Sequence, residues 1–79
     1  MRQTALNQDA IEIDRQLAEA GWSVVLTSDQ AAEILGLSRG RTLCALRERR
    51  LKGHRLGGTG AWRVHRLDVA RFIVGLTPS

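Results

Sequence analysis

Residues 26–73 read LTSDQAAEILGLSRGRTLCALRERRLKGHRLGGTGAWRVHRLDVARFI, and the fold can be predicted outward from this stretch. Its opening predicts a helix over residues 28–35, because Thr27 and Gln30 have the spacing of a capping box and apolar residues follow at helical intervals. In a capping box, each of the two side chains accepts a hydrogen bond from the other residue's backbone N–H. The start of this helix is therefore well defined by the sequence.

A second helix follows after a very short turn. Gly36 suits the left-handed conformation that ends many helices, Leu37 supplies an apolar residue to the turn, and Ser38 is a typical N-cap. The helix that Ser38 begins is expected to run from Arg39 to about Arg49. Two helices joined by so few residues predict a helix-turn-helix unit, whose second helix enters the major groove of DNA.

Glycine-rich sequence then separates two strand-like stretches. Strands are expected over about residues 53–56 and 61–64, with a hairpin turn over residues 57–60. A last helix is expected over about residues 66–76. Its predicted core face carries Val69, Phe72, Ile73 and Leu76. This order predicts a mainly α fold with a small β-hairpin or three-stranded sheet, which is a winged helix-turn-helix.

The N-terminal segment predicts an amphipathic helix. It is expected over residues 7–20, with Asn7 as the N-cap, apolar residues recurring on one face, and Gly21 as the stop. The opposite face is acidic, so we expect it to lie away from DNA, either behind the domain or against a protein. A short strand over residues 22–26 could extend the sheet of the hairpin.

The 79 residues are enough for one small domain. Three segments are expected within it: an accessory helix and strand over residues 1–25, the winged helix-turn-helix over residues 26–76, and a tail over residues 77–79. The apolar runs are too short to span a membrane, and the N-terminal segment is too polar for a signal peptide. A cytoplasmic protein is therefore expected.

Charge is divided unevenly along the chain. Residues 1–38 hold two Arg and six Asp or Glu, a net charge of −4, whereas residues 39–79 hold ten Lys or Arg and two Asp or Glu, a net charge of +8. Eleven of the twelve basic residues are Arg, whose planar guanidinium suits bidentate contacts to phosphate and guanine. The basic charge thus lies where the fold would place double-stranded DNA.

The second helix of the helix-turn-helix is expected to face DNA with its first turn. Thr42, Ala45 and Leu46 have the spacing of a core face, so their neighbours turn outward. Arg41 could contact O6 and N7 of a guanine, and Gly40 would allow close approach to the groove floor. Solvated arginines are a less favoured interpretation, because cations at a helix N-terminus oppose the helix dipole. The expected contacts are Ser38, Arg39, Gly40, Arg41, Leu43, Cys44 and Arg47.

The hairpin predicts a wing that contacts DNA beside this helix. Its strands carry Arg55 and Arg63, both expected to be exposed, on either side of a tip with almost no side chains. A nucleotide-binding loop is the rival interpretation, but neither GxxxxGK[ST] nor GxGxxG is present. Trp62 is expected in the core rather than stacked on a base. The expected contacts of the wing are Arg55, Gly58, Thr59, Gly60 and Arg63.

Catalytic and metal-binding patterns are missing from the sequence. Cys44 is the only cysteine, so no internal disulfide is expected, and with His54 and His65 it has no metal-ligand spacing. No Ser/His/Asp arrangement or pair of carboxylates predicts catalysis. We therefore expect a non-enzymatic protein with no cofactor and no metal.

The stretch over residues 26–73 resembles the excisionase-family DNA-binding domain, a small winged helix related to the DNA-binding head of MerR-type regulators. The resemblance is carried by Leu26-Thr27, Ala31-Ala32, Leu35 to Ser38, Arg39 to Leu46, Arg55 to Gly58, Trp62 to Val64, Asp68-Val69 and Phe72-Ile73. One departure is that the glycine usual between the recognition helix and the first wing strand is Arg49 or Arg50 here. A second departure is a longer wing tip over residues 59–61.

The resemblance implies a site-specific binder with its recognition helix in the major groove and its wing in the adjacent minor groove. It also implies a non-enzymatic architectural protein that assists an integrase in DNA recombination, as in a prophage or mobile element. A transcriptional repressor, or an antitoxin with a toxin as partner, could use the same fold. An RNA- or ribosome-associated domain is disfavoured, because few aromatic residues are present for base stacking. Since no coiled-coil heptads are present, we expect a monomer that binds DNA cooperatively at several same-orientation sites.

Overall fold

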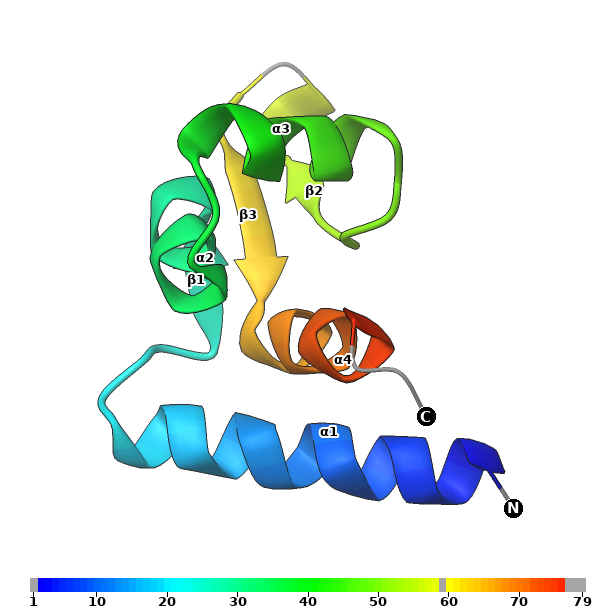
Figure 1. Ribbon diagram of the computed structural model, residues 1–79. Coiled ribbons are helices and arrows are strands. Elements are labelled where there is room, and N and C mark those ends of the chain that lie inside the picture. The colour runs from blue at the N-terminus through cyan, green and yellow to red at the C-terminus, as the bar shows by residue number, and fades with distance from the viewer. Residues whose placement is uncertain (1, 59, 77–79) are drawn as a thin grey trace.

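The computed structural model describes residues 2–58 and 60–76, which form four α-helices, one 3-10 turn and a three-stranded antiparallel sheet (Figure 1). The elements are α1 (Arg2–Glu19), β1 (Val25–Thr27), α2 (Ser28–Leu35), α3 (Arg39–Arg47), β2 (His54–Arg55), η1 (Leu56–Gly58), β3 (Trp62–His65) and α4 (Arg66–Leu76). β3 lies between β1 and β2. The predicted fold class is confirmed. The expected tail over residues 77–79 lies outside the described residues.

α1 lies at the opposite end of the molecule from α3 and packs along α4 (Figure 1). The helix begins at Arg2, so the prediction that Asn7 is its N-cap is wrong. Residues 2–6 include several good helix formers, and they continue the helix in the N-terminal direction. The predicted stop is confirmed, since the helix ends at Glu19 and Gly21 has a φ of 100°.

β1 is displaced from the strand predicted over residues 22–26. The N–H of Trp22 donates to the carbonyl of Leu17 at 3.0 Å, so this residue belongs to the end of α1. The strand itself has three residues, and its central residue, Leu26, lies directly opposite Val64 of β3. Both of these side chains are fully buried. β1 therefore anchors the sheet to the core, as expected of a third strand.

α2 and α3 begin where the sequence predicts. The N–H of Gln30 donates to Thr27 Oγ1 at 3.1 Å, and the N–H of Thr27 donates to Gln30 Oε1 at 2.9 Å, which completes the capping box. Gly36 ends α2 with a φ of 68°. Ser38 caps α3, because its hydroxyl accepts from the N–H of Arg41 at 3.2 Å. The turn between the two helices is therefore confirmed.

α3 ends earlier than predicted. Its last residue is Arg47, whereas the sequence predicted a helix to about Arg49. Arg49 instead has a φ of 62°, in the left-handed region. The turn at this position takes the chain out of the helix, and Leu51 then enters the core with its side chain fully buried.

The hairpin has shorter strands and a more compact turn than predicted. β2 has two residues rather than the four expected over residues 53–56. In place of a simple glycine linker, η1 makes one 3-10 turn, and the N–H of Gly60 donates to the carbonyl of Leu56 at 2.8 Å. A Cβ at Gly60 would lie 2.4 Å from that carbonyl oxygen, so only glycine fits there.

The core lies between the sheet and the helices. Its buried cluster comprises Leu26, Ala31, Ala45, Leu46, Leu51, Val64 and Val69. Trp62, Phe72 and Ile73 are half-buried against this cluster, which confirms the core placement of Trp62. Leu76 is 60% exposed, so its predicted place on the core face is wrong. It is the last residue of α4, where the helix has passed the end of the core.

Candidate nucleic-acid interface

The outer side of α3 carries most of the residues predicted to contact DNA. The Ser38 hydroxyl caps the helix. The Nε of Arg39 lies 3.7 Å from a carboxylate oxygen of Asp29, and this exposed ion pair contributes little stability in water. Gly40, Arg41, Cys44 and Arg47 are also exposed, with Arg41 and Cys44 on the flank of the helix toward α4 and Arg47 on the flank toward the wing. α3 therefore presents a surface of arginines and small residues.

Gly40 lies in the first turn of α3. A Cβ built at this position would meet no atom within 4 Å. The fold does not require glycine here, although glycine makes a helix less stable than alanine does, by about 0.5 to 1 kcal/mol. The missing side chain leaves room for the floor of a groove to approach the helix backbone.

Leu43 differs from the other predicted contacts of α3. It is half-buried and packs against the core cluster. Thr42, Ala45 and Leu46 are fully buried, as predicted for the core face. The Thr42 hydroxyl donates to the carbonyl of Ser38 at 3.0 Å, so this buried hydroxyl has a partner. Leu43 lies at the border between the core and the outer side of the helix.

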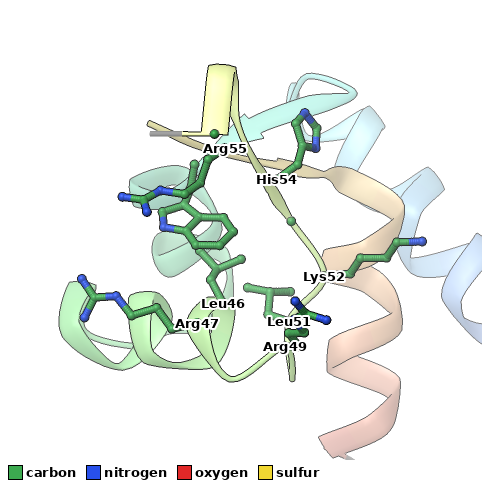
Figure 2. A pocket seen from close by; sticks show the side chains of 10 residues that line it. Leu46, Arg47, Arg49, Leu51, Lys52, His54 and Arg55 are labelled. Carbon is green, nitrogen blue, oxygen red and sulfur yellow. The ribbon is translucent and has the colours of Figure 1, made fainter. Parts of the chain in front are cut away.

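A hollow of about 680 Å³ separates the end of α3 from the wing (Figure 2). Its apolar lining includes Leu46 and Leu51. The basic side chains that line it are Arg47, Arg49, Lys52 and Arg55. None of the described residues that line it is acidic, and none of these four cations forms an ion pair within the described part of the chain. The hollow therefore combines an apolar lining with unpaired positive charge.

Arg55 is held at the rim of this hollow. Its guanidinium carbon lies 5.4 Å from the centre of the Trp62 ring, within the range of a cation–π contact. Its Nε also donates to the carbonyl of Gly60 at 3.4 Å. Figure 2 shows Arg47 and Arg55 on the same side of the hollow, one from α3 and the other from β2. The recognition helix and the wing therefore each supply a cation to it.

Arg63 lies on the other face of the sheet from Arg55. Side chains alternate between the two faces along a strand, and residues directly opposite each other share a face. Arg55 is opposite Trp62, and Arg63 is opposite His54. Arg63 is half-buried and donates to the carbonyl of Trp62 at 3.0 Å. The prediction that both arginines are exposed is therefore wrong for Arg63, and the structure does not bring the two together.

Two glycines of the wing tip were predicted to contact DNA. Gly58 is exposed, with a φ of 78°, and Gly60 is half-buried. Thr59, the remaining predicted contact of the tip, lies outside the described residues. Of the predicted wing residues, Arg55 and Gly58 line the hollow beside α3.

Two of the four cations that line the hollow, Arg49 and Lys52, are missing from the predicted contacts. The sequence predicts that Arg49 ends a longer helix and that Lys52 lies in the segment between this helix and the wing. The signal that could have found them is the run RERRLK over residues 47–52, which has four basic residues in six positions. Such a run is often a solvated surface, and the turn after α3 brings three of its four basic residues, Arg47, Arg49 and Lys52, to the hollow.

The charges on α1 are arranged differently, because they pair with one another. Arg15 forms ion pairs with Glu12 and with Glu19, the latter at 2.7 Å. The hydrogen bond from Arg15 lowers the pKa of the Glu12 carboxyl below its ordinary value. The acidic face of α1 is thus partly neutralised within the helix itself.

A second ion pair ties α1 to α4. The Nε of Arg66 donates to Asp14 Oδ1 at 2.7 Å, and another guanidinium nitrogen donates to the carbonyl of Trp22 at 2.8 Å. The side chains of Arg66 and Asp14 are only 15% and 25% exposed. This arginine therefore fastens the N-terminal segment to the rest of the domain.

Other kinds of site find little support. Among the described residues, no three His, Cys, Asp or Glu side chains gather closely enough to hold a metal ion. The ring centres of His54 and His65 lie 5.9 Å apart, without a third such side chain in the described part of the chain to complete a site. No described helix combines the length and the apolar character needed to cross a bilayer.

Comparison with known proteins agrees with this geometry. The sequence profile of a helix-turn-helix domain family matches residues 25–74, more than half of the chain. The chain belongs to this helix-turn-helix family. Neither a curated protein nor a solved structure matches it. The match runs from β1 into α4, so this helix-turn-helix protein has a DNA-binding domain that includes α2, α3 and the wing.

Proposed function

We propose that this helix-turn-helix protein binds specific DNA sites in the cytoplasm and acts, without catalysis, as an architectural recombination factor of the excisionase type that assists an integrase. The observation that carries the DNA-binding part is the hollow beside α3. Its four cations have no acidic partner among the described residues. Cations without a partner in the fold attract a phosphate strand, whose charge they neutralise.

In this proposal the first turn of α3 enters the major groove. Arg41 contacts a guanine there, and Gly40 lets the helix backbone approach the bases. The hollow receives the sugar-phosphate backbone at the edge of that groove. The wing reaches toward the adjacent minor groove through Arg55 and Gly58. Arg63 is left out of this interface, because it lies on the other face of the sheet.

We further propose that the protein is a monomer that binds side by side at several same-orientation sites and bends the DNA. The apolar face of α1 packs along α4, with Ala10 buried and Ile13 and Leu17 half-buried. A helix whose apolar face is already covered has little apolar surface left for a dimer interface. Bending of the DNA by neighbouring copies would then supply the architectural role.

A repressor, or an antitoxin that neutralises a toxin, is the second candidate. The observation in its favour is Ile11, which is 59% exposed on the outer side of α1, beside Glu12. An exposed isoleucine on a charged helix offers a contact for a protein partner. A dimer formed through α1 would read an inverted repeat, with half-sites about one helical turn apart.

The two candidates differ in how copies are arranged on DNA. Sites would be selected from a pool of random duplexes and footprinted, and the free protein would be sedimented. The excisionase proposal expects a monomer in solution and protected sites that repeat in one orientation. A stable dimer that protects one inverted repeat would contradict it and favour the repressor or antitoxin.

A further inference from the structure

Three helices in the described part of the chain end in the same pair of backbone hydrogen bonds. In each, a residue in the left-handed conformation donates its N–H to the carbonyl three residues earlier, and the next N–H donates to the carbonyl five residues before it. The donor pairs are Gly21 with Trp22 after α1, Gly36 with Leu37 after α2, and Arg49 with Arg50 after α3. The same turn is thus built twice with glycine and once with arginine.

Arg49 is the exception among these helix ends. Its φ is 62°, and among the described residues it is the only one other than glycine with a positive φ. In this conformation a Cβ comes too close to the following carbonyl oxygen, which is unfavourable for residues other than glycine and, to a smaller extent, asparagine and aspartate. The backbone at position 49 therefore favours glycine, as Gly21 and Gly36 show at the equivalent positions.

Arg49 lies in the segment that joins α3 to the wing. It lines the hollow together with Lys52 and Arg55 (Figure 2). It is exposed and forms no ion pair within the described residues. The next residue, Arg50, is in contrast paired with Glu48 at 2.8 Å. Arg49 therefore combines an unfavourable backbone conformation with a cation that the fold itself does not use.

We infer that Arg49 binds a phosphate of the DNA backbone, and that this contact is why arginine stands where the fold favours glycine. The inference rests on the proposed DNA binding. Backbone strain is retained at positions where a ligand contact requires it. The contact is to a phosphate and not to a base, because Arg49 follows the C-terminal end of α3, whereas base contacts come from the N-terminal turn of a recognition helix.

The test measures thermal melting and DNA binding on the full chain, comparing Arg49→Gly with the wild type. Binding is followed by the fluorescence anisotropy of a labelled 20-base-pair duplex of mixed sequence over a series of salt concentrations, since non-specific affinity depends on phosphate contacts. Relief of the left-handed strain is expected to raise the melting temperature by about 4 °C. Loss of one phosphate contact is expected to reduce the slope of log K against log salt by about 0.9, and the affinity at low salt roughly fivefold.

Matched variants separate the side chain from the backbone. Arg50→Gly removes the same charge one residue away, at a position without a positive φ, and is expected neither to raise the melting temperature nor to change the salt slope. Arg49→Asn removes the charge with a residue that tolerates the left-handed conformation, so it should bind as weakly as Arg49→Gly. Arg49→Lys keeps the cation and is expected to keep the salt slope of the wild type.

The outcomes distinguish this inference from the proposed function. A wild-type chain without salt-dependent binding to the duplex would refute the proposed DNA binding itself. Wild-type binding that is unchanged in Arg49→Gly and Arg49→Asn would overturn the inference alone. A lower melting temperature for Arg49→Gly would overturn the strain argument, and an equal loss of binding in Arg50→Gly would show a general charge effect.

Discussion

The two ends of this molecule differ in how their cations are paired. At the end formed by α1 and α4, Arg15 pairs with Glu12 and Glu19, and Arg66 pairs with Asp14. At the end formed by α3 and the wing, Arg39 pairs with Asp29 and Arg50 with Glu48, but the four cations that line the hollow have no acidic partner among the described residues. The part-buried pair of Arg66 and Asp14 ties α1 to α4, whereas the unpaired cations beside α3 are available to a ligand. The difference predicts that stability and DNA binding can be changed separately.

The largest effect is expected from removing the paired end. Deletion of residues 1–21 exposes the surface of α4 that Ile13 and Leu17 cover, and burial of such side chains is worth about 1.5 to 3 kcal/mol each. We therefore expect thermal or urea unfolding to show a loss of roughly 3 kcal/mol or more, with weak residual DNA binding. If melting and DNA affinity are both unaltered, residues 1–21 do not stabilise the domain and instead form a segment that binds a partner.

A single substitution at the same end should have a smaller effect on stability alone. Asp14→Ala leaves a largely buried guanidinium at Arg66 without its carboxylate, and the expected loss, between those of exposed and buried pairs, is about 1 to 2 kcal/mol. Urea unfolding measures it, with Asp9→Ala on the exposed side of α1 as the control. Weakened binding of DNA by the folded Asp14→Ala protein would contradict the prediction that this end of the molecule affects stability alone.

At the other end, the two wing arginines are predicted to behave differently. Arg55→Ala removes an exposed cation from the hollow, so the slope of log K against log salt should fall by about 0.9 with little change in melting. Arg63→Ala alters the opposite face of the sheet and should leave that slope unchanged. Equal effects of the two substitutions would mean that DNA contacts both faces of the hairpin.

The smallest expected effect on stability is a gain. Gly40→Ala fills open space in the first turn of α3, so thermal melting should show a stabilisation of about 0.5 to 1 kcal/mol. If DNA approaches the helix backbone at this position, the added methyl group should weaken binding to the selected site more than binding to a mixed-sequence duplex. Gly75→Ala in α4, which also has open space, is the matched control.

Local signals explain which parts of the structure could be predicted from the sequence. The capping box at Thr27 and the caps at Gly36 and Ser38 depend on residues only a few positions apart, and the structure has them where the sequence predicts them. The face that Arg63 occupies depends on strand register, and the exposure of Leu76 depends on where the core ends. Both are properties of the assembled fold, which a short stretch of sequence does not determine.

The hollow shows the same limit at the candidate site. The sequence shows a basic C-terminal half and predicts DNA contacts from Arg47 and Arg55. It does not predict that Arg49 and Lys52 line the same hollow. Their convergence depends on the left-handed turn at Arg49, an arginine in a conformation that local preference assigns to glycine. Helix propensity predicts a longer α3, but the chain leaves the helix earlier and Leu51 packs into the core.

The most direct test of the account is a map of the DNA contact by nuclear magnetic resonance. Backbone amide shifts of the isotope-labelled chain would be followed during titration with a mixed-sequence duplex at low salt. We expect the largest shifts in the first turn of α3 and at the residues that line the hollow, namely Arg47, Arg49, Lys52, Arg55 and Gly58, with little change along α1. Shifts concentrated on α1, or on the sheet face that carries Arg63, would contradict the claim that the unpaired cations beside α3 bind the DNA backbone.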